Sequence, residues 1–284
     1  MKKKVLTILI IILALISFLY FSNNYLSTSF YEVTSNEIPK NFNNYKIVQI
    51  SDLHSKYFGK KQSYLISKIN KINPDIIVFT GDMYDGNRDE NISCIKPAID
   101  LINELSKNYP IYYVTGNHEY DNKFHKEFQN SIKHKQNVFY LSEDVIEIKK
   151  DNESIFLTGI DDVSFYSTKD ISFYRTLLNL SDKANKGFNI LLSHRPYEIK
   201  KLLSKTNYDL ILSGHNHGGQ IAIPFILPNG IYSPSETFFP KYTKGIHQIG
   251  KNQLILSRGL GNSRFPFRVF NPPEIVTIML KSSE

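Results

Sequence analysis

Residues 76–82 read IIVFTGD, in which four large apolar residues are followed by a threonine, a glycine and an aspartate. A continuous apolar run of this kind is typical of a strand buried on both faces of a parallel sheet. Similar runs lead into polar loops elsewhere in the chain, at 45–50, 111–114, 155–157, 189–192 and 210–212. Between several of them, apolar residues recur at helical spacing. Strands alternating with helices predict an α/β fold rather than an all-β barrel.

Length and composition limit the class of protein. The 284 residues are 41% hydrophobic and 21% charged, a globular mix that excludes a fibrous or wholly disordered chain. The net charge is +7, of which Lys2, Lys3 and Lys4 supply three, so the rest of the chain carries only +4. We therefore expect no nucleic-acid partner. The single cysteine, Cys94, excludes a disulfide framework and a cysteine-based zinc site.

The N-terminal segment has the pattern of a membrane anchor. Residues 5–22 carry no charge, and 18 helical residues roughly match a ~30 Å hydrocarbon core. Three lysines precede this run, and Glu32 and Glu37 come before the next basic residue. The positive-inside rule then places the N-terminus in the cytoplasm and the rest of the chain outside the cell membrane. The alternative is a cleaved signal peptide with a small-residue site at 27–29, although the apolar run exceeds the usual 7–15 residues.

We expect three parts in the chain. Residues 1–22 form a transmembrane signal-anchor. Residues 23–43 are rich in Ser, Asn, Thr and Tyr and form a juxtamembrane spacer. Residues 44–284 show no break in composition and form one folded domain.

Metal-binding residue types gather behind the predicted strands. In α/β folds, ligands sit beyond the carboxyl ends of the strands. Imidazoles mixed with carboxylates and one amide suit Mn, Fe, Zn or a similar ion better than Ca or Mg, and they are too many for one tetrahedral zinc. We therefore predict two divalent ions that share a carboxylate. The residues that follow strands are Asp52, His54, Asp82, Asn117, His118, His194, His215 and His217.

The motifs around these residues resemble those of the calcineurin-like metallophosphoesterases. The resemblance covers roughly residues 45 to 280, and a weaker similarity of the tail, from Gly259 to Glu274, is to a membrane-anchored bacterial branch. It implies a four-layer α/β/β/α sandwich with two mixed sheets. The matching motifs, in the family's order, are Asp52-Leu53-His54, Gly81-Asp82, Gly116-Asn117-His118-Glu119, the single His194, and Gly214-His215-Asn216-His217.

The resemblance also implies roles for these residues. One ion would be held by Asp52, His54 and His217, the other by Asn117, His194 and His215, with Asp82 bridging them. His118 would face the substrate and protonate the leaving oxygen, unless its role is structural. Asp85 lies where some family members carry an aspartate that orients this histidine, although Asp85-Gly86 is also a common turn dipeptide.

The expected function is hydrolysis of a phosphodiester or phosphomonoester by a metal-bridging hydroxide, at the membrane and on substrates that include lipids or envelope molecules. One alternative is a pyrophosphatase acting on a lipid-linked nucleotide such as UDP-2,3-diacylglucosamine, against which the predicted orientation argues. The other is a scaffold that holds metal without turnover, against which the full ligand set argues. The sequence does not define the oligomeric state.

Several arginines are candidates for phosphate or headgroup contacts. Arg195 follows His194 directly, and Arg258, Arg264 and Arg268 lie in the tail. Bidentate bonds to a phosphate are one role for such residues. Surface ion pairs are the more common role.

Overall fold

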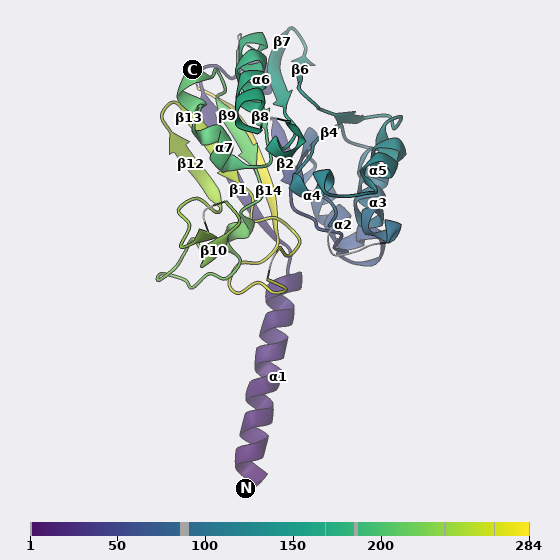
Figure 1. Ribbon diagram of the computed structural model, residues 1–284, viewed down its shortest axis with the longest axis vertical. Coiled ribbons are helices and arrows are strands. Elements are labelled where there is room, and N and C mark those ends of the chain that lie inside the picture. Colours follow the sequence, from purple (N-terminus) through teal and green to yellow (C-terminus); the bar gives the residue numbers. More distant parts are fainter. Residues whose placement is uncertain are drawn as a thin grey trace.

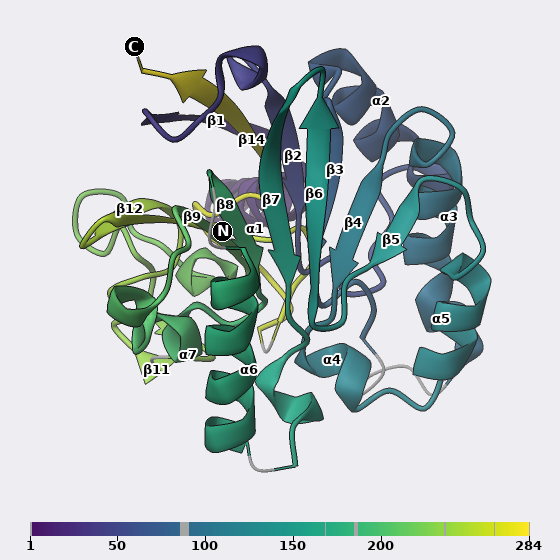
Figure 2. The same cartoon turned by 90° about the horizontal axis from the view of Figure 1, so that it is seen from above.

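The computed structural model describes residues 2–85, 91–167, 169–184, 187–235, 237–263 and 265–283. Its main body contains two six-stranded sheets (Figures 1 and 2). In spatial order the first sheet contains β1 (Ser27–Ser35), β14 (Glu274–Ser282), β2 (Lys46–Ile50), β3 (Ile76–Thr80), β4 (Ile111–Val114) and β5 (Val138–Tyr140). The second contains β12 (Gly245–Ile249), β13 (Asn252–Leu256), β9 (Leu210–Ser213), β8 (Asn189–Leu192), β7 (Glu153–Gly159) and β6 (Asp144–Lys150).

Both sheets are mixed, as the family resemblance implies. In the first sheet β2 to β5 are parallel and β14 runs antiparallel to β2. In the second sheet β13, β9, β8 and β7 are parallel, and the edge strands β12 and β6 are antiparallel to their neighbours. The parallel strands of each sheet therefore deliver their carboxyl ends to one edge, where loops can meet.

Helices cover the outer face of each sheet. Figure 2 shows α2, α3 and α5 on the side of the first sheet and α6 and α7 on the side of the second. The helices are α2 (Ser63–Ile72), α3 (Lys96–Leu105), α4 (Asn117–Tyr120), α5 (His125–Ile132), α6 (Lys169–Lys183) and α7 (Pro196–Lys200). Single 3₁₀ turns are η1 (Lys40–Phe42), η2 (Lys60–Gln62), η3 (Ile92–Ile95), η4 (Val163–Phe165), η5 (Leu203–Lys205) and η6 (His217–Gly219).

Alternation along the buried strands explains the layers. In β3, Ile77 and Phe79 pack toward the helices of the first sheet, whereas Ile76 and Val78 pack between the two sheets. Successive strand side chains point to opposite faces, so a strand that is apolar throughout has an apolar environment on both. A third core lies between the second sheet and its helices and includes Leu191 of β8. Three cores separate four layers, which is the α/β/β/α arrangement that the resemblance implies.

The N-terminal helix projects away from the sandwich (Figure 1). Among the described residues, α1 (Lys2–Asn24) is the one helix long and apolar enough to cross a membrane, through the stretch Lys3–Asn24. Its large apolar side chains are exposed, among them Leu13 at 65% and Ile11 at 61%. Along most of its length the helix thus has no apolar partner in the part of the chain that the structure describes.

The predicted spacer at residues 23–43 is corrected by the structure. Ser27–Ser35 forms β1, which pairs with β14 over nine residues, and Lys40–Phe42 forms η1 with Phe42 fully buried. Most of β1 is partly exposed because it is an edge strand. Its Ser- and Thr-rich composition therefore reads as a polar linker, although its backbone belongs to the sheet. The helix ends at Asn24, so only two residues separate it from β1.

Candidate metal centre

Five parallel strands of the two sheets carry the predicted ligands at their carboxyl ends. Asp52 and His54 follow β2, and Asp82 follows β3. Asn117 begins α4 just after β4, and His194 follows β8. His215 and His217 follow β9. Each of these short apolar strands thus ends just before a predicted metal ligand.

A first cluster joins the ends of β2 and β9. The Nε2 atom of His217 lies 3.2 Å from Oδ1 of Asp52 and 3.2 Å from Nε2 of His54. The Nε2 atom of His54 is 4.0 Å from the same Asp52 oxygen. All three side chains are buried. Three donor atoms this close form a group that could hold one ion.

A second cluster joins the ends of β3, β8 and β9. The Nε2 atom of His194 lies 3.1 Å from Oδ2 of Asp82 and 3.1 Å from Nδ1 of His215. The same Asp82 oxygen is 3.7 Å from Nε2 of His54 in the first cluster. Asp82 therefore lies between the two groups, where a shared carboxylate is expected.

A buried amide oxygen and an oriented imidazole are suited to ligate a metal ion. The Oδ1 atom of Asn117 is buried without a hydrogen-bond partner among the described residues. A buried polar atom left unpaired is costly, so such an atom is usually explained by an ion or a functional contact. The Nδ1 atom of His194 donates to the carbonyl of Thr80 at 2.8 Å, which leaves Nε2 as the ring nitrogen that faces the cluster. The residues present thus fit divalent cations.

The backbone of the centre is strained. Five of the seven predicted ligands have left-handed φ angles: Asp52 (51°), His54 (45°), Asp82 (54°), His215 (68°) and His217 (47°). A non-glycine residue with positive φ is uncommon, and such residues cluster at functional sites. The left-handed turns let consecutive loop residues present side chains to one point instead of to opposite faces of a strand.

Two glycines allow these loops to approach one another. A Cβ on Gly116 would lie 2.2 Å from Oδ1 of Asp82. A Cβ on Gly214 would lie 2.3 Å from Oδ2 of Asp52 and 1.9 Å from Oγ of Ser51. The glycines that precede Asn117 and His215 in the motifs are therefore required by packing.

His118 lies beside these two clusters, and with His54 and Asp85 it forms a third group whose ligand atoms lie within 4.8 Å of one another. Its Nδ1 atom lies 3.1 Å from Oδ1 of Asp85, and its backbone N–H donates to Oδ1 of Asp82 at 2.9 Å. Its ring meets His54 edge-on at 4.7 Å between centroids. The second oxygen of Asp85 is 3.6 Å from Nδ1 of His54. Asp85 thus contacts both imidazoles, and the side chain of His118 keeps 17% exposure to solvent.

The charges of the centre follow from burial and from these contacts. Burial lowers the pKa of His215 and His217 well below 6.5, so both are neutral, as metal ligands must be. Burial opposes ionisation of Asp82, but His194 and His118 hold its pKa well below 3.8. Burial alone would lower the pKa of His118, yet Asp82 and Asp85 raise it to about 9. His118 can therefore hold a proton at neutral pH.

Glu119 is a further residue of the centre, to which the sequence analysis assigned no role. Its carboxylate is fully buried and accepts from the N–H groups of Asp82 (2.9 Å), Met83 (2.7 Å) and Gly116 (2.8 Å). It thereby joins the loop after β3 to the loop after β4. Glu119 lies three positions after Gly116, the residue that caps the N-terminus of α4. This capping-box spacing is the sequence signal that could have indicated its role.

The candidate phosphate-binding arginines near the strands have other partners. Arg195 donates to Oδ2 of Asp162 at 2.7 Å, and Arg258 lies 3.1 Å from Oε1 of Glu274. Ion pairing, the more common role, therefore applies to both arginines.

Arg268 is fully buried and lies 3.4 Å from Nδ1 of His217. Its guanidinium donates to the backbone carbonyls of Gly261, Arg258 and Asn271. It supports the loop behind a predicted metal ligand and does not reach solvent. Arg264 lies outside the described residues.

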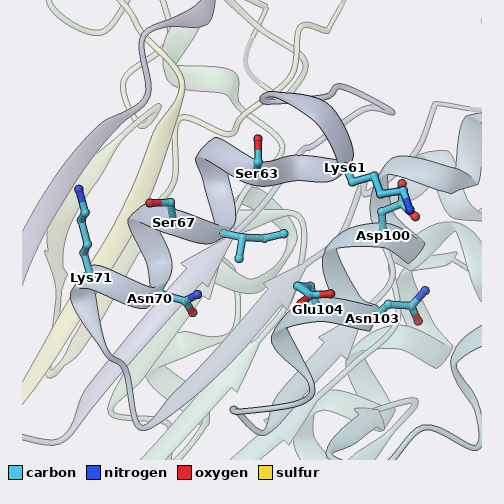
Figure 3. Close-up of a pocket in the computed structure, with 9 residues that line it drawn as sticks. Lys61, Ser63, Ser67, Asn70, Lys71, Asp100, Asn103 and Glu104 are labelled. Carbon is cyan, nitrogen blue, oxygen red and sulfur yellow. The ribbon is translucent and has the colours of Figure 1, made fainter.

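A hollow of about 830 Å³ between α2 and α3 is separate from this centre (Figure 3). Its lining carries charges of both signs, from Lys61 and Lys71 and from Asp100 and Glu104, and Figure 3 shows Lys61 beside Asp100. None of the predicted ligands lines it. A surface with charges of both signs does not attract a phosphate group. We therefore do not assign this hollow to the binding of a phosphoester.

Comparison with known proteins identifies the family. The profile of the calcineurin-like phosphoesterases matches residues 45–219. The chain belongs to this family. Residues 45–219 include every predicted ligand, so the converging loops are those of a metal-dependent phosphoester hydrolase. The family is consistent with divalent metal ions and a phosphoester substrate.

Relatives extend over most of the phosphoesterase chain. It is 32% identical over 268 residues to the metallophosphoesterase YkuE of Bacillus subtilis, covering 93% of this chain and 88% of the relative. It is 30% identical to the metallophosphoesterase Cj0846 of Campylobacter jejuni, covering 92% of this chain and 66% of that one. It is 28% identical to a bovine transmembrane protein with a metallophosphoesterase domain, covering 89% of this chain but only 56% of that protein.

Proposed function

We propose that this phosphoesterase is a single-pass membrane protein that binds two divalent ions and cleaves a phosphomonoester or phosphodiester. The observation that carries the proposal is the position of Asp82, whose Oδ2 atom lies 3.1 Å from His194 and 3.7 Å from His54. One carboxylate between two clusters suits a pair of ions about 3.5–4 Å apart. The ions would be Mn, Fe, Zn or a similar metal, given the imidazole-rich donor set.

The chain's residues divide into holding and reacting groups. We assign Asp52, His54 and His217 to one ion and His194, His215 and the unpaired Oδ1 of Asn117 to the other, with Asp82 shared. When bound, the ions supply positive charge for the phosphoryl oxygens and lower the pKa of a water molecule. The strained ligand loops hold the donors in place before any substrate arrives.

His118 is the proposed general acid. Its Nδ1 faces Asp85, so Nε2 is the ring nitrogen left to protonate the leaving oxygen of the ester. Asp85 is the positioning residue, since it contacts His118 and fixes the ring. The negative charges of Asp82 and Asp85 raise the pKa of His118 to about 9, which keeps the acid protonated in the free chain at neutral pH.

We place the enzyme in the cell membrane through residues 1–22, with the catalytic domain outside the cytoplasm. Three lysines precede the apolar helix, and the next charged residues after it are acidic. The substrate proposed from this location is a phosphoester carried by a lipid or another envelope molecule. Esters that never leave the cytoplasm would not meet the site.

The test is a panel of esters with and without added metal, run on the full chain in detergent. It compares Asp82→Asn with Asp151→Asn, an exposed aspartate in the turn between β6 and β7. Asp82→Asn should lose bound metal and hydrolysis together, and Asp151→Asn should match the wild type. Two bound ions with no hydrolysis of any monoester or diester would instead support a metal-binding scaffold and refute the proposal.

A further inference from the structure

An exposed apolar loop lies at the same end of the sandwich as the N-terminal helix. Residues 223–239, here called the aromatic loop, contain the short hairpin of β10 (Tyr232–Ser233) and β11 (Thr237–Phe238). Figure 1 shows this region beside the point where α1 leaves the domain. Its exposed side chains include Phe225 (101%), Ile226 (74%), Phe238 (64%) and Phe239 (69%). Large apolar residues gathered in one loop usually mark a contact surface.

The composition and backbone of the aromatic loop suit an apolar environment. Residues 221–240 contain a single charged residue, Glu236, which lies outside the described residues. Phe225 and Phe239 have positive φ angles of 66° and 56°. Bulky residues rarely adopt this conformation, and retained strain of this kind points to a functional demand. Here the two strained residues carry aromatic side chains that are exposed to solvent instead of buried in a core.

Printed contacts fix the aromatic loop relative to α1. The rings of Phe18 in α1 and Phe270 lie 5.0 Å apart. The backbone N–H of Arg268 donates to Oδ1 of Asn23, in the last turn of α1, at 3.0 Å. The segment at 268–270 in turn pairs with the start of the loop, because the N–H of Ala222 donates to the carbonyl of Val269 at 2.9 Å. The helix and the loop are therefore held in one arrangement.

The same segment reaches the metal centre. The side-chain amide of Asn271 donates to the carbonyl of His217 at 2.6 Å, and the guanidinium of Arg268 lies 3.4 Å from Nδ1 of His217. Residues 268–271 thus contact α1, the residue directly before the aromatic loop and a predicted metal ligand.

We propose that the aromatic loop inserts into the outer leaflet of the bilayer beside α1 and seats the metal centre next to the lipid headgroups. The proposal rests on the membrane anchoring given under Proposed function, and it narrows the substrate to phosphoesters held at the membrane surface. We favour a bilayer as the partner of the aromatic loop, because the loop lies beside the apolar helix that would cross the bilayer. A loop that enters beside a spanning helix adds a second contact and so fixes the tilt of the domain.

The absence of tryptophan from the chain allows a direct test. Three full-length variants, each with a single tryptophan, are reconstituted in phosphatidylcholine–phosphatidylglycerol vesicles with and without acyl-brominated lipid. Leu13→Trp reports on α1, and Phe225→Trp reports on the aromatic loop. Ile171→Trp is the matched control, since this exposed residue belongs to α6, a helix that Figure 1 shows at the end of the sandwich opposite α1. Unchanged hydrolysis of a water-soluble ester shows that each variant is folded.

The Phe225→Trp emission should shift to shorter wavelength and lose about half or more of its intensity to brominated lipid, as expected for a side chain below the headgroups. Ile171→Trp should lose none. Quenching of Leu13→Trp without quenching of Phe225→Trp would overturn the proposal while leaving the anchor in place. Protection of Phe225→Trp from acrylamide without lipid quenching would also overturn it, because a second copy of the chain would then cover the loop. If brominated lipid quenched neither Leu13→Trp nor Phe225→Trp, the proposed membrane anchor would be refuted as well.

A functional comparison tests the narrowed substrate class. Replacing Phe225 and Phe239 together by serine should lower hydrolysis of a lipid phosphate in vesicles by about tenfold or more, since the loop loses most of its apolar contact area. Hydrolysis of the water-soluble p-nitrophenyl phosphate should stay unchanged. Equal rates of the double variant and the wild type on the vesicle substrate would refute a role for the loop in reaching it.

Discussion

Replacing Gly214 by alanine should disturb the metal centre without changing any ligand. The new Cβ would stand 2.3 Å from Oδ2 of Asp52, 1.9 Å from Oγ of Ser51 and 3.0 Å from Cβ of Ser51. The Ser51 hydroxyl can rotate away, but the Asp52 carboxylate is held by the backbone N–H of His215 at 3.1 Å. Separations below 3.0 Å are essentially never seen for a real Cβ, so the Asp52 oxygen must retreat by at least 0.7 Å.

A displacement of this size exceeds the tolerance of a metal–ligand bond, which is about 0.2 Å. We expect the affinity for the ion at Asp52 to fall by about 10–100-fold. The catalytic efficiency kcat/KM should fall by about 100-fold at limiting metal, because a shift of about 1 Å near the reacting groups costs that much. Metal titration followed by elemental analysis, with kcat/KM measured at each metal concentration, gives both quantities.

Gly250→Ala is the matched control for this experiment. A Cβ at Gly250 has no neighbour within 4 Å, but the φ of 60° strains an alanine there. The control should therefore cost about 1 kcal/mol of stability and leave metal affinity unchanged. If Gly214→Ala keeps wild-type metal affinity and activity, the close approach of the two loops is not what places Asp52.

Three further results are expected. His118→Asn should keep both ions and slow hydrolysis of an alkyl ester by about 10²–10⁴-fold, with a smaller loss on an aryl ester whose leaving group needs no proton; equal losses on both would exclude the acid role. Chelation should lower the melting temperature by about 5–10 °C, because ions at 100 times Kd stabilise by about 2.7 kcal/mol, and added Mn or Zn should restore it; a melting temperature indifferent to chelator contradicts this. Burial lowers the pKa of His125 to about 4, so its neutral form stabilises the fold above pH 6.5 and this contribution is lost as the pH falls toward 4. After allowance for solvent screening, the free energy of unfolding should fall by about 1–2 kcal/mol over this pH range. Urea unfolding at a series of pH values measures this fall, which should disappear in His125→Gln and persist in the control His134→Gln at an exposed position.

The buried strands were predictable because both of their faces are apolar. The runs at 111–114 and 189–192 match the observed strands β4 and β8 at both ends. Edge strands give no such signal, since one face and one side meet solvent. That is why β1 read as a spacer, although nine of its residues pair with β14. The pairing partner lies about 240 residues away, and no local pattern in 27–35 indicates it.

The convergence of the candidate ligands could be predicted from the sequence, because each follows a strand whose carboxyl end lies at the same edge of its sheet. Their separation could not, since it depends on loop conformation: His54 and His217 approach to 3.2 Å only because both adopt left-handed φ angles. The role of Glu119 was equally hidden. Its carboxylate accepts hydrogen bonds from three backbone N–H groups in two different loops. Every residue except proline has such a group, so the residue types in these loops do not indicate the contacts.

The pairing of β1 with β14 has a consequence for biosynthesis. Strand β1 emerges first, directly behind α1, but the strand it pairs with is the last in the chain. At about 5–20 residues per second, translation leaves β1 waiting roughly 10–50 s for β14. Throughout that interval β1 and the side of β2 that pairs with β14 are open strand edges. The first sheet can close only after β14 has been synthesised, so the unpaired edges of the growing chain could pair with a neighbouring chain in the meantime.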